Sequence, residues 1–270
     1  MKLLQFQGAV AVAIYLTWVP WASGQSVEKI IAGKPSPDGS SVLFARYEDG
    51  QGVRDTEIYT ARPDGSQQRK LTDNTSLDGY PDWSPDGKHI VFISNRSGTN
   101  QIHQMTSDGE QVRQLSTSTL GVGDLVKYGP DGRIAYIALR EQQGKIKLYD
   151  LILTDGTVAK PLAGRMRVTD FAWQADGNSI AYGGVGQIVF HDLNSDAKTM
   201  VKCEDIDARL HTHAVRHIRW QPDNESITCR IEFLGGRAQS ENSPATKLFG
   251  DDELFTVTRD GKVSWAPIPK

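Results

Sequence analysis

One dipeptide, Asp-Gly, recurs along this 270-residue chain far more often than chance allows. With 23 aspartates and 26 glycines, about two such pairs are expected, and ten are present. Asp-Gly between alternating apolar runs is typical of tight hairpin turns, because glycine adopts a positive φ at no steric cost. The chain is therefore expected to be all-β and built from many short strands.

Five of the turns are copies of one repeat. The third residue of each copy is an aspartate, and these aspartates recur at intervals of 45 to 48 residues. Four of the five copies also have a large aromatic residue three positions before the aspartate. Such regular spacing is typical of repeat architectures. The copies are Ser36-Pro-Asp-Gly39, Ser84-Pro-Asp-Gly87, Gly129-Pro-Asp-Gly132, Gln174-Ala-Asp-Gly177 and Gln221-Pro-Asp-Asn224, and the aromatic residues are Trp83, Tyr128, Trp173 and Trp220.

Strand patterns follow each turn in the same order. An alternating apolar segment such as Ile90 and Phe92 comes first, and then a third strand, a second turn and a short outer strand. Each repeat is thus predicted to be a four-stranded antiparallel unit that cannot bury both of its faces alone. Stacking the units around an axis buries them, which predicts a β-propeller of five blades. Six blades remain the alternative, and the fifth repeat carries an insertion over residues 235–249.

The first residues have the pattern of a secretory signal peptide. An apolar stretch follows Lys2 and ends in Ala22-Ser23-Gly24. We expect residues 1–24 to be the signal peptide, with an uncleaved membrane anchor as the alternative, and residues 25–270 to be a single propeller domain. No other segment of the sequence predicts a membrane span. The net charge of −3 argues against a broad nucleic-acid surface.

An exported protein can form disulfides, and Cys203 and Cys229 are the only cysteines. The repeat alignment places Cys229 in an apolar strand position that other copies fill with Phe or Tyr. This position favours buried free thiols over a disulfide.

The segment from Gly79 to Gly98, with Asp108-Gly109 after it, resembles the repeat of the TolB-type β-propeller family, a WD-like repeat with a Pro-Asp-Gly turn. The second copy of the repeat in this chain reads Pro-Asp-Trp-Ser-Pro-Asp-Gly, then an apolar strand ending in Ser-Asn-Arg, then Ile102 and Met105. The resemblance implies a periplasmic or secreted protein that binds a protein or peptide partner in the cell envelope. The family's namesake also has an N-terminal α/β domain, and the resemblance here covers the propeller part only. Fold resemblance alone does not establish function.

Motifs for common catalytic chemistry are missing from the sequence. It has no Gly-x-Ser-x-Gly elbow, phosphate-binding loop or dinucleotide fingerprint. A non-enzymatic role without a cofactor is therefore favoured. The alternative is a carbohydrate-active enzyme, such as a metal-assisted lyase of acidic oligosaccharides, with a divalent metal on His211, His213 and His217. Calcium held by channel carboxylates is a third, structural alternative.

Binding residues are expected where the chain enters the innermost strands, at the channel mouth. The turn aspartates are excluded, because accepting a backbone N–H two residues on explains them. Asp78 and Asp124 are candidates for a ligand surface just before these strands. The residues predicted to contact a partner, all expected on connecting segments, are Tyr80, Asp82, Arg96, Asp170, Arg216 and His217.

Overall fold

The computed structural model describes residues 30–50, 53–143, 146–163, 166–206, 213–233 and 253–267. Within these residues, twenty strands form five four-stranded antiparallel sheets, and the strands of each sheet pair in chain order. The all-β prediction of five four-stranded blades is confirmed. The expected signal peptide, the insertion at 235–249 and His211 lie outside the described residues.

The blades follow one another along the chain. Blade 1 comprises β1 (Ile30–Pro35), β2 (Val42–Gly50), β3 (Val53–Ala61) and β4 (Arg69–Lys70). Blade 2 comprises β5 (Asp78–Trp83), β6 (His89–Ser94), β7 (Gln101–Thr106) and β8 (Arg113–Gln114). Blade 3 comprises β9 (Val122–Tyr128), β10 (Ile134–Gln143), β11 (Ile146–Thr154) and β12 (Ala159–Pro161). Blade 4 comprises β13 (Val168–Trp173), β14 (Ser179–Gly184), β15 (Gln187–Asp192) and β16 (Lys198–Lys202), and blade 5 comprises β17 (His213–Trp220), β18 (Ser226–Phe233), β19 (Glu253–Thr258) and β20 (Val263–Pro267).

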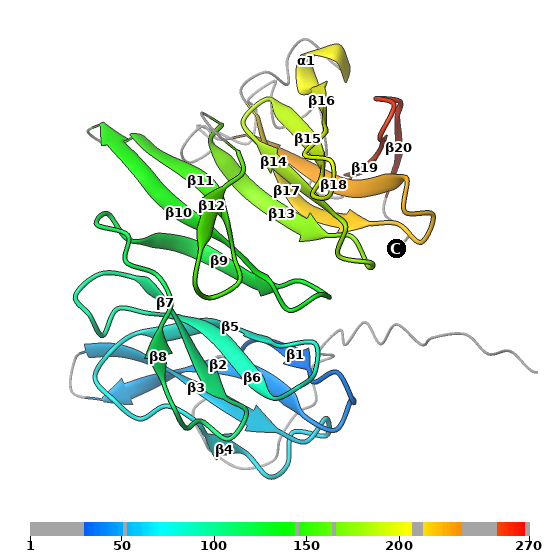
Figure 1. The fold of residues 1–270 in the computed structure, drawn as a ribbon. Helices are drawn as coiled ribbons and strands as arrows, with labels where there is room; N and C mark the ends of the chain where they lie inside the picture. Colours follow the sequence, from blue (N-terminus) through cyan, green and yellow to red (C-terminus); the bar gives the residue numbers. More distant parts are fainter. Residues whose placement is uncertain are drawn as a thin grey trace, which may run out of the picture.

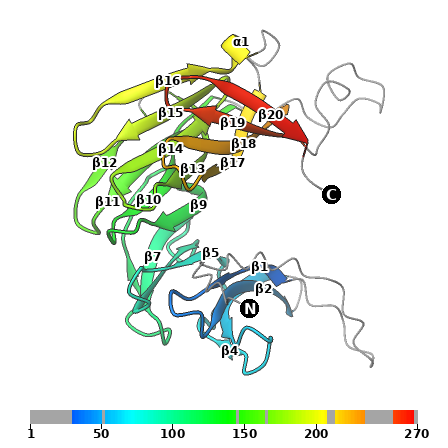
Figure 2. The same ribbon diagram turned by 90° about the vertical axis from the view of Figure 1, so that its right-hand side faces the viewer.

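The five sheets succeed one another in an arc, with the first strand of each blade on the inner side (Figure 1, Figure 2). Extensive strand contacts join blade 1 to blade 2 and so on to blade 5. Among the described strands, no comparable contact joins blade 5 to blade 1. Between blades 4 and 5 lies a four-residue helix, α1 (Cys203–Ile206). Within the described part of the chain, no helix is long and apolar enough to cross a membrane.

The predicted turn chemistry is present at the first hairpin of every blade. The five turn aspartates each accept a hydrogen bond from the backbone N–H two residues on, at 2.9 to 3.1 Å. The glycine after each aspartate has a positive φ, and Asn224, which replaces it in blade 5, does too at 56°. Asparagine tolerates this left-handed conformation better than most residues, which explains the substitution.

Separate apolar cores fill the four interfaces between successive blades. The middle strands are buried on both faces, and β14 shows how: Ile180 and Tyr182 pack against blade 3, whereas Ala181 packs against blade 5. The alternating pattern therefore assigns successive side chains to two different cores, rather than to a core and to solvent. Full burial of a side chain as large as Ile180 contributes roughly 1.5–3 kcal/mol to the stability of the fold.

The repeated aromatic residue also ties neighbouring blades together. Trp83 donates its indole N–H to the carbonyl oxygen of Lys34 in blade 1, at 3.2 Å. Trp220 donates in the same way to Ala172 in blade 4, at 3.0 Å. Each acceptor lies four residues before the turn aspartate of the preceding blade. In blades 2 and 5 the tryptophan thus links the blade to the backbone of the one before it, whereas the indole N–H of Trp173 in blade 4 has no hydrogen-bond partner among the described residues.

Both cysteines are free and buried, as the sequence predicts. They share the core between blades 4 and 5. Burial raises the pKa of the Cys203 thiol to about 12 and raises that of Cys229 as well. Both side chains therefore act as small apolar groups at neutral pH.

Candidate functional site

Every innermost strand is interrupted by a bulge in its pairing with the second strand of its blade. The interruptions lie between residues 31 and 34, 79 and 82, 122 and 126, 168 and 170, and 216 and 219. A bulge bends its strand and redirects the side chains beside it. In blades 2 and 5 it places Tyr80 and His217 at φ values of 53° and 54°. A positive φ is uncommon for such bulky residues and concentrates at functional sites.

A pocket of about 440 Å³ opens where the innermost strands of blades 3, 4 and 5 begin. Three predicted contact residues, Asp170, Arg216 and His217, line it together. The remaining wall is Gly123, Asp124, Leu125, Ile137, Tyr149, Arg167, Val168 and Thr169. The pocket thus combines two arginines and a histidine with two carboxylates and several apolar side chains, as specific binding sites commonly do.

Tyr80 extends this site into blade 2. Its side chain is about half exposed (48%). Burial raises the pKa of the Tyr80 hydroxyl, and the charge of Asp124, which also hydrogen-bonds to it, acts in the same direction. Since Asp124 lines the pocket, Tyr80 lies at its border, and four blades contribute to one surface.

Asp170 is mainly engaged in holding blades 4 and 5 together. Its Oδ1 accepts a hydrogen bond from its neighbour Phe171 N at 2.7 Å, and its Oδ2 accepts one from Ile218 N in β17 at 3.1 Å. Lys127 Nζ lies 3.8 Å from Oδ1. With these partners in place, Asp170 shapes the pocket wall and offers a ligand little free acceptor capacity.

Asp82 has a similar role between blades 1, 2 and 3. Its Oδ1 accepts a hydrogen bond from Lys34 Nζ at 2.9 Å, and its Oδ2 accepts one from Tyr128 N at 2.8 Å. The side chain is 19% exposed. Asp82 does not line the pocket and instead joins the innermost strands of three blades.

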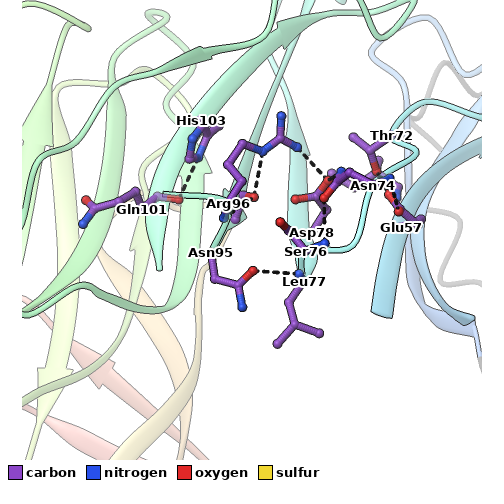
Figure 3. Close-up of polar contacts among 12 residues, drawn as sticks. Glu57, Thr72, Asn74, Ser76, Leu77, Asp78, Asn95, Arg96, Gln101 and His103 are labelled. Carbon is purple, nitrogen blue, oxygen red and sulfur yellow. Dashed lines mark hydrogen bonds and ion pairs between the residues drawn. The ribbon is translucent and has the colours of Figure 1, made fainter. Parts of the chain in front are cut away.

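Arg96 belongs to a separate polar cluster between blades 1 and 2 (Figure 3). Its guanidinium donates a 2.7 Å hydrogen bond to Oδ2 of Asp78, and its Nε donates to Ser94 at 2.9 Å. Asp78 has no exposed surface, and the side-chain amide of Asn74 donates to the same Oδ2 at 2.8 Å. A buried carboxylate requires such compensation. Arg96 therefore neutralises a charge within the fold.

The same cluster reaches blade 1 through Glu57, which is almost fully buried. Its carboxylate accepts hydrogen bonds from the Thr72 hydroxyl and, at 2.7 Å, from Asn74 N. Burial raises the pKa of Glu57, and nearby Asp78 raises it further. The connection between blades 1 and 2 is thereby held by buried polar contacts.

The expectation that the contact residues and the candidate aspartates lie on connecting segments or just before strands is wrong for most of them. Only Arg96 lies on a connection, between β6 and β7. The innermost strands extend further toward their N-terminal ends than apolar alternation indicates, because the bulges interrupt the two-residue period there. Strands contain Asp78, Tyr80 and Asp82 (β5), Asp124 (β9), Asp170 (β13), and His213, Arg216 and His217 (β17).

The predicted histidine cluster is only partly described. His213 is buried at the start of β17, His217 is exposed, and His211 lies outside the described residues. Within the described ranges, no group of three or more His, Cys, Asp or Glu side chains could hold a metal ion. Metal binding by all three histidines stays a prediction.

A second pocket of about 440 Å³ lies between the hairpin turns of blades 1 and 2. Its acidic lining residues, Asp38 and Asp86, are engaged in their own turns. The pocket at the start of the strands therefore has the stronger case as a binding site. Sequence reasoning missed Arg167 and Thr169, which also line the pocket at the start of the strands and lie three residues and one residue before the predicted Asp170.

Comparison with known proteins supports the propeller assignment. Residues 22–125 match the family described as TolB beta propeller domain. The structure of TolB from Acinetobacter baumannii superposes with a TM-score of 0.58 at 18% identity, covering 89% of this chain and 58% of that one. Likeness at this identity shows the fold, and the chain has a TolB-like propeller fold.

Curated relatives also match in sequence, and two of them illustrate how much of the chain is shared. An uncharacterised protein of Agrobacterium fabrum is 29% identical over 161 residues, which cover 54% of this chain and 52% of the relative. Dipeptidyl-peptidase 5 of Porphyromonas gingivalis is 29% identical over 213 residues, covering 60% of this chain and 31% of the peptidase. The chain thus matches about half or less of the length of these relatives.

Proposed function

We propose that this chain is an exported, non-enzymatic propeller that binds a protein or peptide partner in the cell envelope. The observation that carries the proposal is the pocket shared by blades 3 to 5, with Tyr80 of blade 2 at its border. Loops and strand ends on a rigid scaffold are a common place for recognition residues. Here the scaffold brings distant parts of the sequence to one surface.

The chemistry around the pocket suits a protein surface. Leu77, Tyr80 and Leu120 are large apolar side chains that are 42–48% exposed, and all three lie at or just before the start of an innermost strand. Arginine and tyrosine are frequent energetic centres of interfaces. Arg216 and Tyr80 are therefore assigned as the main contacts, together with His217.

The other predicted contacts are given supporting roles. Asp82 and Asp170 hold the innermost strands in register across blades, and Arg96 neutralises Asp78. Removing any of these three would disturb the fold as well as the surface. They are unsuitable for a test of partner binding.

The test is capture of partners from a cell-envelope extract, followed by titration of the purified partner. The double variant Tyr80→Ala/Arg216→Ala is expected to raise the dissociation constant at least about tenfold. The matched control is Val158→Ala/Arg113→Ala, which changes an exposed apolar residue and an exposed arginine near the outer strands of blades 3 and 2. Absence of a saturable partner, or equal loss in both variants, would contradict the proposal.

Export is supported by the apolar stretch before Gln25 and by the TolB-like fold. Cleavage after Gly24 predicts that the protein recovered from the periplasm or medium begins at Gln25. Its intact mass measures this directly. A mass that includes residues 1–24 would contradict cleavage.

A further inference from the structure

One position of the repeat carries a charged residue in four of the five blades. It lies four residues before the turn aspartate, on the innermost strand. Because the five strands are structurally equivalent, their residues at this position form an open ring that follows the arc of blades, one residue from each blade. The ring consists of Lys34, Asp82, Lys127, Ala172 and Arg219.

Two cations of this ring have carboxylate partners in neighbouring blades. Lys34 Nζ donates to Asp82 at 2.9 Å across blades 1 and 2. Lys127 Nζ donates to the carbonyl oxygen of Phe171 at 2.7 Å and lies 3.8 Å from Asp170. Blade 4 has alanine at the ring position, and Asp170 supplies the carboxylate from two residues earlier.

Arg219 is the remaining cation. It is exposed, and its guanidinium has no ion pair with a described residue. Neither Asp82 nor Asp170 has much hydrogen-bond acceptor capacity left for Arg219, since each also accepts a hydrogen bond from a backbone N–H of the following blade. The ring therefore has three cations and two occupied carboxylates.

These charges act on one another. Burial lowers the pKa of the Lys127 amine, and Lys34 and Arg219 lower it further, whereas Asp170 and Asp82 oppose them. These four charged groups thus all lie within electrostatic range of one partly buried amine, that of Lys127. Charges that share a poorly solvated site interact more strongly than charges in water.

We propose that Arg219, together with Lys127 and Lys34, binds one compact oxyanion, a carboxylate or a phosphate, among the innermost strands. A guanidinium presents two parallel N–H donors that match the oxygens of either group. The anion balances the excess positive charge of the ring. Along the innermost strands, this site lies nearer the hairpin turns than the pocket residues do. It does not depend on a protein partner.

Isothermal titration of the full chain with phosphate, and separately with acetate, at constant ionic strength tests the site. Saturable binding of at least one anion is expected, with an affinity at least about tenfold weaker in Arg219→Gln. Tighter binding of phosphate or of acetate identifies the preferred group. Arg69→Gln, on the outer strand β4, is the matched control and should bind like the wild type.

Two further measurements keep the test independent of folding. Arg219→Lys retains the charge and loses the paired donors, so it should bind with intermediate affinity. In the wild type, the NMR signal of the Ile218 amide, next to Arg219, should shift with the same saturation curve. Absence of saturable binding of both anions, or binding that survives in Arg219→Gln, would overturn the proposal.

Discussion

Tyr80 and His217 occupy the same position in two different blades and have nearly the same backbone conformation. Each lies six residues before the turn aspartate, within the bulge of an innermost strand, with a φ of 53° or 54°. The left-handed region costs a residue with a Cβ roughly 1–2 kcal/mol. Two blades thus retain a strained residue at the surface assigned to binding.

Replacing either of these strained residues with glycine should increase the stability of the fold while weakening partner binding. Tyr80→Gly and His217→Gly are each expected to raise the free energy of unfolding by roughly 0.5–1 kcal/mol, because glycine adopts positive φ freely but loses more entropy on folding. Both should weaken partner binding. Denaturant titration and partner titration of the same samples measure the two effects.

Gln67 and Gln111 provide the matched control, since each has a φ of 53° outside the innermost strands. Gln67→Gly and Gln111→Gly should increase stability to a similar extent and leave partner binding unchanged. Stability that falls in all four variants would show that the positive φ carries no strain here.

Loss of the Arg96 side chain should destabilise the fold strongly. Arg96→Ala leaves the buried Asp78 carboxylate without its cation, and breaking a buried pair in this way costs roughly 3–5 kcal/mol. Lys262→Ala removes a cation from the exposed pair with Asp260 and should cost less than about 1 kcal/mol. Equal losses in urea denaturation would contradict the buried role of Arg96.

Acid should weaken the fold through aspartates in two kinds of turn: Asp38 in the first hairpin of blade 1, and Asp155 and Asp260 in the turns between the third and fourth strands of blades 3 and 5. Hydrogen bonds from Ser36 to Asp38, from Val158 N to Asp155 and from Lys262 to Asp260 hold the pKa of each carboxyl at about 2, below the ordinary 3.8. A lowered folded-state pKa contributes stability above pH 3.8, and this contribution is lost as the pH falls toward 2. The triple variant with Asn at these positions should lose stability at pH 7 and show a flatter decline between pH 4 and 2. An unchanged slope in thermal unfolding across this range would contradict the assignment.

The interface between blades 4 and 5 should reject even one added methyl group. A Cβ at Gly183 would lie 2.5 Å from the Cβ of Val215, whereas a Cβ at Gly79 would meet only Thr56 Oγ1, at 4.0 Å. Overpacking of a core costs typically about 1–3 kcal/mol. Gly183→Ala should therefore lower the unfolding midpoint clearly, and Gly79→Ala should change it little. The opposite order would contradict the packing of these blades.

The repeat could be predicted because it depends on local chemistry. Asp-Gly turns, the aromatic three residues before them and the alternating strands each have a physical cause that acts within a few residues. Even the exception, Asn224, follows from the tolerance of asparagine for positive φ. The number of blades then follows from the number of turns.

The candidate site was only partly predictable, because its geometry depends on contacts between blades. The sequence places Asp82 and Asp170 near the channel, but it does not show that backbone N–H groups of the next blade occupy them. It also does not show that Arg96 neutralises Asp78. The side-chain directions of residues near a bulge cannot be deduced from the sequence, since the bulge breaks the two-residue period from which strand faces are assigned.

Four of the hydrogen bonds between blades run from a side chain to a main chain. Trp83, Trp220, Asp82 and Asp170 all bind a carbonyl oxygen or an N–H of the adjoining blade. The main chain offers these groups whichever side chain its residue carries, proline's missing N–H excepted. These four hydrogen bonds therefore do not depend on the side chains of the adjoining blade, so a chimaera built blade by blade would mainly need to match the apolar cores between blades.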